Sequence, residues 1–172
     1  MSTEPRWSDQ PSSGHTLECV AAFTGRLEDV TDARVTAELF LAVLGRTQPP
    51  SAPEHWDDIL LVVTELAANA VQYAPGPFRL TLRRTFDGVH VTLGDTNTTP
   101  PAPRAFRPGK GGGGIGWYLI QTLCDQVSVV VHKEPEKPVN PDNPENSSGG
   151  GEGGGAEDSG EVGKDVHVFL PW

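Results

Sequence analysis

Two runs of alternating apolar and polar residues constrain this chain more than any other feature. The apolar positions of these runs are Phe78, Leu80 and Leu82, followed by Val89, Val91 and Leu93. Alternation with a period of two predicts strands with one buried face, and the Asp87-Gly88 pair between the runs predicts a two-residue turn. The sequence therefore predicts an antiparallel hairpin whose apolar face is covered by another layer.

Other segments predict the remaining strands and the covering helices. Further strands are expected over residues 16–24, 127–132 and 166–170. Helices are expected over residues 31–44, 54–73 and 115–124. The first helix has a cap at Thr31 or Asp32, with Val35, Leu39, Ala42 and Val43 at helical spacing. We expect an α/β (α+β) two-layer sandwich, in which about three helices cover one face of a mixed, mostly antiparallel sheet.

The chain is expected to hold one domain with two appendages. Its 172 residues are enough for one sizeable core. Residues 1–14 are polar and predict a disordered arm, and residues 15–172 form the single domain. Within it, residues 134–163 are acidic and rich in Gly and Pro, which predicts a disordered insertion before the last strand.

The composition argues against several classes of function and location. The formal net charge is -10 and no basic residues cluster, so we expect no nucleic-acid partner. The first fifteen residues hold no apolar run and no later segment is long enough to span a bilayer, so we expect no signal peptide, no membrane partner and a cytoplasmic location. Cys19 and Cys124 have apolar neighbours and no metal-site spacing, which predicts buried thiols.

The second predicted helix carries the first candidate site residues. Glu65 and Asn69 are four residues apart, which places their side chains one turn from each other on the same side of a helix. A carboxylate can take a proton as a general base, and an amide oxygen beside it can ligate Mg²⁺. A solvated helix face has the same spacing, so this pair alone leaves both interpretations open.

Asp95 continues the parity of the second strand of the hairpin, and we therefore expect it on the buried face at the end of that strand. An unpaired carboxylate is costly there. A ligand that offers an amino group, such as the exocyclic amine of adenine, would satisfy it, whereas the carbonyl of guanine would be repelled. The alternative is that the strand has ended and Asp95 caps a turn through Thr96 and Asn97.

A glycine-rich segment directly precedes the third predicted helix. Residues 111–116 read Gly-Gly-Gly-Gly-Ile-Gly. Glycines let the backbone approach an anion closely, and free amides at a helix start favour phosphate. A flexible linker is the alternative interpretation. The segment is not a P-loop, because no Gly-Lys-Ser/Thr ends it.

These three segments, taken in order, resemble the nucleotide-binding motifs of the GHKL ATP-binding superfamily. The matching stretches are Glu-Leu-Ala-Ala-Asn-Ala at 65–70, Gly-Asp-Thr-Asn at 94–97 and Gly-Gly-Gly-Ile-Gly at 112–116. Within that superfamily, the chain is most similar to the anti-sigma-factor serine/threonine kinases and their actinobacterial relatives. The likeness covers about residues 23–132 and the final strand.

The resemblance implies an ATP- and Mg²⁺-dependent site, with residues 98–113 as a mobile lid. Glu65 would be the catalytic general base, Asn69 the Mg²⁺ ligand and Asp95 the adenine contact. The other residues around the nucleotide would be Asn97, Lys110, Gly112, Gly114, Ile115 and Gly116. The resemblance further implies a kinase that phosphorylates a serine or threonine of a small anti-anti-sigma (antagonist) protein, sequesters a sigma factor and forms a homodimer.

A second function stays open beside the kinase. It is a catalytically weak ATP-binding module that acts only through partner binding. Two departures from the motifs favour it: residues 95–98 hold no glycine, and Lys110 and Arg107, the basic candidates for the γ-phosphate, belong to the expected lid.

Overall fold

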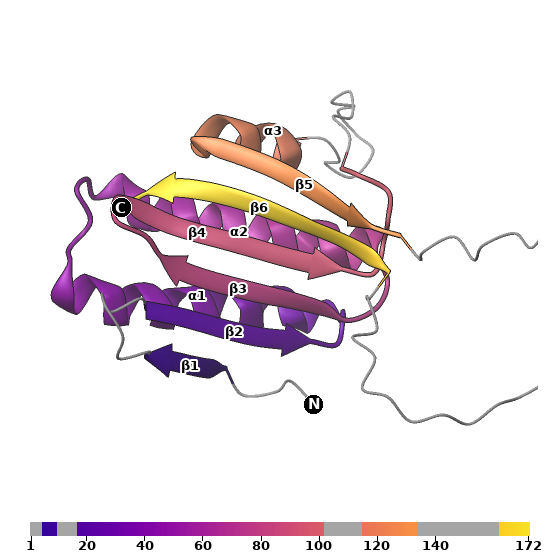
Figure 1. The fold of residues 1–172 in the computed structure, drawn as a ribbon, viewed down its shortest axis with the longest axis horizontal. Helices are drawn as coiled ribbons and strands as arrows, with labels where there is room; N and C mark the ends of the chain where they lie inside the picture. The colour runs from indigo at the N-terminus through magenta and orange to yellow at the C-terminus, as the bar shows by residue number, and fades with distance from the viewer. Residues whose placement is uncertain (1–4, 10–16, 102–114, 134–161) are drawn as a thin grey trace, which may run out of the picture.

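One sheet of six strands and three helices make up the regular structure of the described residues, which are 5–9, 17–101, 115–133 and 162–172 of a computed structural model (Figure 1). The strands are β1 (Arg6–Asp9), β2 (Leu17–Phe23), β3 (Phe78–Arg84), β4 (Gly88–Asp95), β5 (Gln126–His132) and β6 (Gly163–Pro171). The helices are α1 (Glu28–Thr47), α2 (Glu54–Tyr73) and α3 (Ile115–Leu123).

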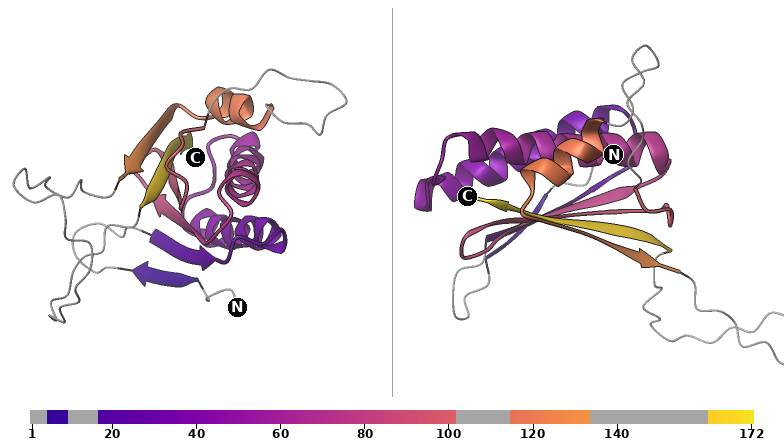
Figure 2. Two further views of the ribbon diagram at one scale, coloured as in Figure 1. Left: turned by 90° about the vertical axis from the view of Figure 1, so that its right-hand side faces the viewer. Right: turned by 90° about the horizontal axis from the view of Figure 1, so that it is seen from above.

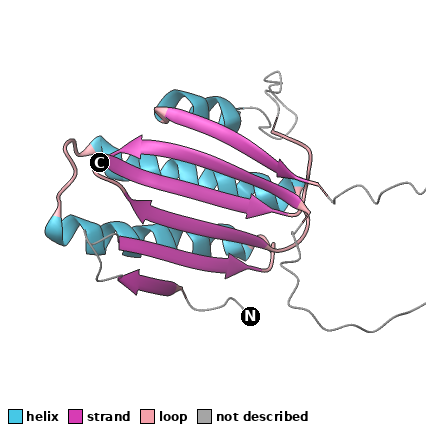
Figure 3. Ribbon diagram, viewed as in Figure 1, coloured by secondary structure: helices cyan, strands magenta, loops and turns pink. Residues whose placement is uncertain are grey.

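The helices and the sheet form two layers. All three helices lie on the same face of the sheet, as the views from its side and from above show (Figure 2). The strand order is β1-β2-β3-β4-β6-β5, so the last strand of the chain lies between β4 and β5 (Figure 3). The predicted two-layer α+β sandwich is confirmed. Where a mixed sheet is expected from the sequence, every ladder between the described strands is antiparallel.

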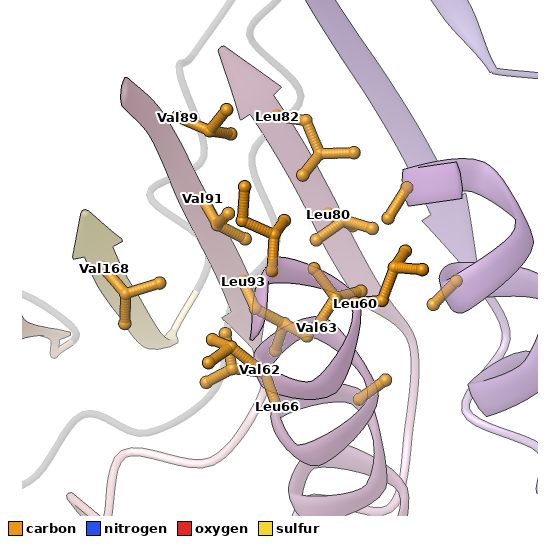
Figure 4. Close-up of a cluster of buried hydrophobic side chains, with 14 of the residues drawn as sticks. Leu60, Val62, Val63, Leu66, Leu80, Leu82, Val89, Val91, Leu93 and Val168 are labelled. Carbon is orange, nitrogen blue, oxygen red and sulfur yellow. The ribbon is translucent and has the colours of Figure 1, made fainter. Parts of the chain in front are cut away.

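The core lies between the hairpin β3–β4 and helix α2 (Figure 4). The predicted alternation is confirmed, because the side chains that meet α2 are buried: Leu80, Leu82, Val89, Val91 and Leu93. The predicted helix 54–73 is also confirmed, and its buried residues include Ile59, Leu60, Val62, Val63 and Leu66. Burial of such side chains contributes about 1.5–3 kcal/mol each, so the hairpin and α2 depend on each other.

The turn of this hairpin lies one residue earlier than the sequence predicts. The amide of Thr85 donates to the carbonyl of Gly88 at 2.8 Å, so Phe86 and Asp87 form the two-residue loop. Gly88 begins β4 instead, where an added Cβ would overlap the carbonyl oxygen of Leu170 on β6. The glycine is therefore needed for close packing between strands and not for the turn.

Helix α1 begins three residues before the earlier of the two predicted caps, and Leu27 at its N-cap makes no side-chain hydrogen bond. The buried carboxylate of Asp29 organises this end instead. Its Oδ2 accepts hydrogen bonds from the amides of Thr24 (3.0 Å) and Arg26 (2.9 Å) and from the Thr24 hydroxyl (2.8 Å). Burial would raise the pKa of Asp29, but these hydrogen bonds outweigh it and hold the pKa below its ordinary value.

Helix α1 also buries a different face from the one its predicted apolar positions form. Val35, Leu39 and Val43 are 46%, 52% and 40% exposed. The buried apolar residues are Ala33, Ala37, Phe40, Leu41 and Leu44. They face α2 and the sheet, where the small Ala33 and Ala37 allow close approach of the two layers. An apolar stripe of α1 is consequently left at the surface.

Of the two predicted appendages, the N-terminal arm contains a strand of the sheet, and the insertion lies mostly outside the described residues. Residues 6–9, within the predicted arm, form β1 and pair with residues 17–20 at the edge of β2, so part of this edge is covered. The rest of the arm and residues 134–161 of the predicted insertion lie outside the described residues. At the described ends of that insertion, His132 of β5 pairs with Gly163 of β6.

The two cysteines are buried and unpaired, as predicted. Burial raises the pKa of Cys19 to about 11, and burial together with the nearby Asp125 and Asp58 raises the pKa of Cys124 to about 12. Both therefore stay protonated and act as small core side chains at neutral pH. No helix in the described part of the chain is both long and apolar enough to cross a membrane.

Candidate functional site

A cavity of about 320 Å³ lies between α2, the start of α3 and the adjacent ends of β4 and β6. Its size falls in the range of about 300–1,000 Å³ that is usual for small-molecule sites. The lining combines apolar and polar side chains, which include Glu65, Asn69, Leu93, Asp95, Asn97, Gly116, Trp117, Lys164 and Val166. The fold thus brings together residues from four segments that are far apart in the sequence.

Glu65 and Asn69 both line this cavity from successive turns of α2, and both are half-buried. The pair therefore faces a cavity and not an open helix surface. Gly116, the second residue of α3, lies against Glu65: a Cβ added at position 116 would overlap Oε2 of the carboxylate. The absence of a side chain at Gly116 is thus required for Glu65 to keep its place at the start of α3.

Asp95 lies on the buried face at the end of β4, as its parity predicts, and its side chain is 5% exposed. The carboxylate is not unpaired, however. Its Oδ1 accepts a hydrogen bond from Nζ of Lys164 at 2.7 Å and another from the amide of Asn97 at 2.9 Å. Asp95 therefore caps the turn into the following loop and also lines the cavity.

Asn97 fixes the beginning of that loop. The side-chain Nδ2 of Asn97 donates to the backbone carbonyl of Tyr73 at the end of α2 (2.8 Å). The backbone carbonyl of Asn97 accepts from Nζ of Lys164 (3.0 Å). Its Oδ1 accepts the amide of Thr99 at 2.9 Å. These contacts hold the loop between α2 and β6 by side-chain hydrogen bonds.

The remaining predicted site residues are divided between the described and the other parts of the chain. Ile115, the first residue of α3, is 44% exposed and is not among the residues that line the cavity. Lys110, Gly112, Gly114 and Arg107 lie outside the described residues, as does most of the expected lid.

Several residues that line the cavity are not among the predicted site residues, and they include Trp117, Val166 and Lys164. The signal for Lys164 is its parity: it is two residues before Val166 on β6 and therefore points to the same buried face. A lysine at a buried strand position needs a partner, and the register of β6 against β4 provides Asp95.

A comparison with known protein families decides the assignment. Residues 23–149 match the model of the histidine kinase-like ATPase domain. The chain belongs to this family. No curated protein matches the chain. Membership implies that this ATPase domain binds ATP, typically with Mg²⁺.

The residues present fit such a ligand. Leu93, Val166 and Trp117 give the cavity an apolar lining suited to a base. Asn69 provides an amide oxygen of the kind that Mg²⁺ binds, and the carboxylate of Glu65 lies one helical turn away. The α3 helix starts at the cavity, where its free amides favour phosphate.

Proposed function

We propose that this ATPase domain is an anti-sigma-factor-type serine/threonine kinase. It phosphorylates a small antagonist protein, and it sequesters a sigma factor when the antagonist does not compete for binding to the kinase. The observation that carries the proposal is the contact between Glu65 and Gly116. It places a carboxylate directly at the helix start that favours phosphate, which is where a kinase needs a general base.

Each polar group of the cavity then has a role. Glu65 takes the proton of the acceptor hydroxyl, and the amide oxygen of Asn69 ligates Mg²⁺. Asp95 accepts a hydrogen bond from the adenine amine. ATP supplies the phosphoryl group. Among the described residues that line the cavity, Lys164 is the single cation and is engaged by Asp95, so the cation at the γ-phosphate comes from another part of the chain.

The exposed stripe of α1 supports a protein-binding role. Val35, Leu39 and Val43 lie at intervals of four residues on one side of the helix, and contiguous exposed apolar side chains of this kind mark interaction sites. Asp32 and Arg46 flank the stripe at its two ends. In an antiparallel pair of α1 helices, Asp32 of one copy would lie near Arg46 of the other, which favours the proposed homodimer.

Sedimentation of the purified chain tests this homodimer. Leu39→Glu introduces a charge at the centre of the stripe and should convert dimers to monomers with little change in melting temperature. A wild-type chain that is monomeric at all concentrations would refute the homodimer.

Calorimetry with ATP, with and without Mg²⁺ and with GTP as control, tests nucleotide binding. Transfer is tested by incubating the chain and γ-labelled ATP with candidate antagonist proteins and sigma factors from the same genome. Glu65→Ala should retain ATP binding and lose transfer, whereas the matched variant Glu54→Ala, at the exposed start of the same helix, should change neither.

The same variants separate the kinase from the alternative, a catalytically weak module that acts only through partner binding. Under that alternative, the wild-type chain transfers phosphate to the candidates slowly or not at all. Glu65→Ala then leaves every partner interaction unchanged. Absence of ATP binding would refute both functions.

A further inference from the structure

Lys164 is a buried cation in the wall of the cavity. The residue is 6% exposed, and its backbone pairs with Asp95 across β4 and β6. An ammonium group has three N–H donors. Two of them bind Oδ1 of Asp95 and the carbonyl of Asn97, and the third has no partner among the described residues.

Asp95 has a matching free position. Both of its assigned hydrogen bonds, from Lys164 and from the amide of Asn97, go to Oδ1. Among the described residues, no donor binds Oδ2. Oδ2 is also not one of the fully buried atoms that lack a partner, so it is open to a ligand. The pair therefore offers a ligand in the cavity one hydrogen-bond acceptor and one donor, which are held next to each other by a 2.7 Å contact.

This donor and acceptor match one edge of adenine. We propose that Lys164 is a specificity-determining residue that donates to ring atom N1 of adenine while Asp95 accepts from the exocyclic amine. The proposal rests on the proposed binding of ATP in this cavity. Guanine carries a carbonyl in place of the amine and a proton on N1, so it would place an acceptor against Asp95 and a donor against Lys164. In the orientation proposed for adenine, both contacts would be repulsive.

The surroundings make this discrimination effective. Both side chains are more than nine-tenths buried, so water competes little for their hydrogen bonds. Asn97 holds the ammonium on one side and the carboxylate on the other, which fixes the orientation of both groups before a ligand arrives. A hydrogen bond from a charged donor is stronger than one from a neutral donor.

The experiment compares ATP with 1-deaza-ATP, in which ring atom N1 is replaced by C–H. Calorimetry on the wild-type chain should show about 10- to 100-fold weaker binding of 1-deaza-ATP, the loss of one hydrogen bond from a charged group. Lys164→Met should weaken ATP by a similar factor and bind the two nucleotides equally. Lys133→Met, at the exposed end of β5, is the matched control and should keep the wild-type preference.

Lys164→Met leaves the Asp95 carboxylate without its cation, which is costly in a buried site. The melting temperature of each variant is therefore measured first, and Asp95→Asn/Lys164→Met, which removes both charges, is the second variant for the same comparison. Equal binding of the two nucleotides by the wild-type chain would overturn the role of Lys164 while leaving ATP binding intact. No binding of ATP at all would overturn the proposed function as well.

Discussion

Replacing Gly116 by alanine should separate the stability of this fold from its function. The added Cβ overlaps Oε2 of Glu65, so the carboxylate has to move. That atom is the far end of a flexible side chain, and a new rotamer costs about 0.5–1.5 kcal/mol. Alanine offsets this cost, because it is favoured over glycine within a helix by up to about 1 kcal/mol. The two effects nearly cancel, and the free energy of unfolding should change by less than about 1 kcal/mol.

The same substitution behaves differently when Glu65 is absent. In a Glu65→Ala background no carboxylate has to move, so Gly116→Ala keeps its full gain of up to about 1 kcal/mol, or roughly 2–4 °C in melting temperature. In the wild-type background, the displaced Glu65 should lower phosphate transfer by about 100-fold or more, the usual contribution of a general base. ATP binding should fall much less.

Thermal unfolding of the four proteins in this cycle gives the coupling between the two positions. A rise in melting temperature that is equal in both backgrounds would show that Glu65 does not contact the start of α3. Full phosphate transfer by Gly116→Ala would show that the position of the carboxylate is unimportant. Either result would refute the reasoning that places the general base at this helix end.

Three further predictions concern the base, the start of α1 and the connection between β5 and β6. The wild-type chain should bind ATP more tightly than GTP in calorimetry and Asp95→Asn should blunt that preference, whereas equal affinities in the wild type would contradict the assignment of Asp95. Asp29→Ala removes three hydrogen bonds and should lower the free energy of unfolding by about 2–4 kcal/mol at pH 7. Because the folded pKa of Asp29 is lowered, this stabilisation is complete above the unfolded value of about 3.9 and is lost as the pH falls through the folded value, so the melting temperatures of wild type and variant should converge as the pH falls below both values. Replacing residues 136–161 by a short turn should leave the melting temperature within about 2 °C, since the strand ends on either side are paired, and a large drop would contradict this.

The sequence predicts a segment best when its apolar residues follow a single periodicity, either that of a helix or that of a strand. Helix 54–73 lies between proline-rich stretches, and its bounds are those of α2. The hairpin follows from strict alternation, and its buried residues are the predicted ones. The turn is displaced by one residue because Gly88 serves strand packing, a need that depends on the neighbouring β6 and is invisible in the local sequence.

Helix α1 shows where a local pattern misleads. Two stripes with helical spacing are present, and the one that holds Val35, Leu39 and Val43 is exposed. The buried stripe includes Ala33 and Ala37, whose value lies in close approach to α2 and not in their own apolar area. Strand β1 is a related case, because four mostly polar residues acquire their structure only from the open edge of β2.

The site was predictable as far as it depends on short segments. Glu65 and Asn69 follow from helical spacing, and Asp95 follows from strand parity, so all three reach the same cavity. The partner of Asp95 depends on the pairing of β4 with β6, two strands that are separated by the third helix and a long insertion. Lys164 is therefore recognisable only when two facts are combined: it shares the buried parity of Val166, and a buried lysine requires a nearby carboxylate. The acidic composition of the segment before β6 hides this, because it makes Lys164 look like a counterion of a solvated stretch. A buried strand position that carries a charge, opposite a strand end that carries the opposite charge, thus indicates a buried ion pair more strongly than the charge balance of the surrounding sequence does.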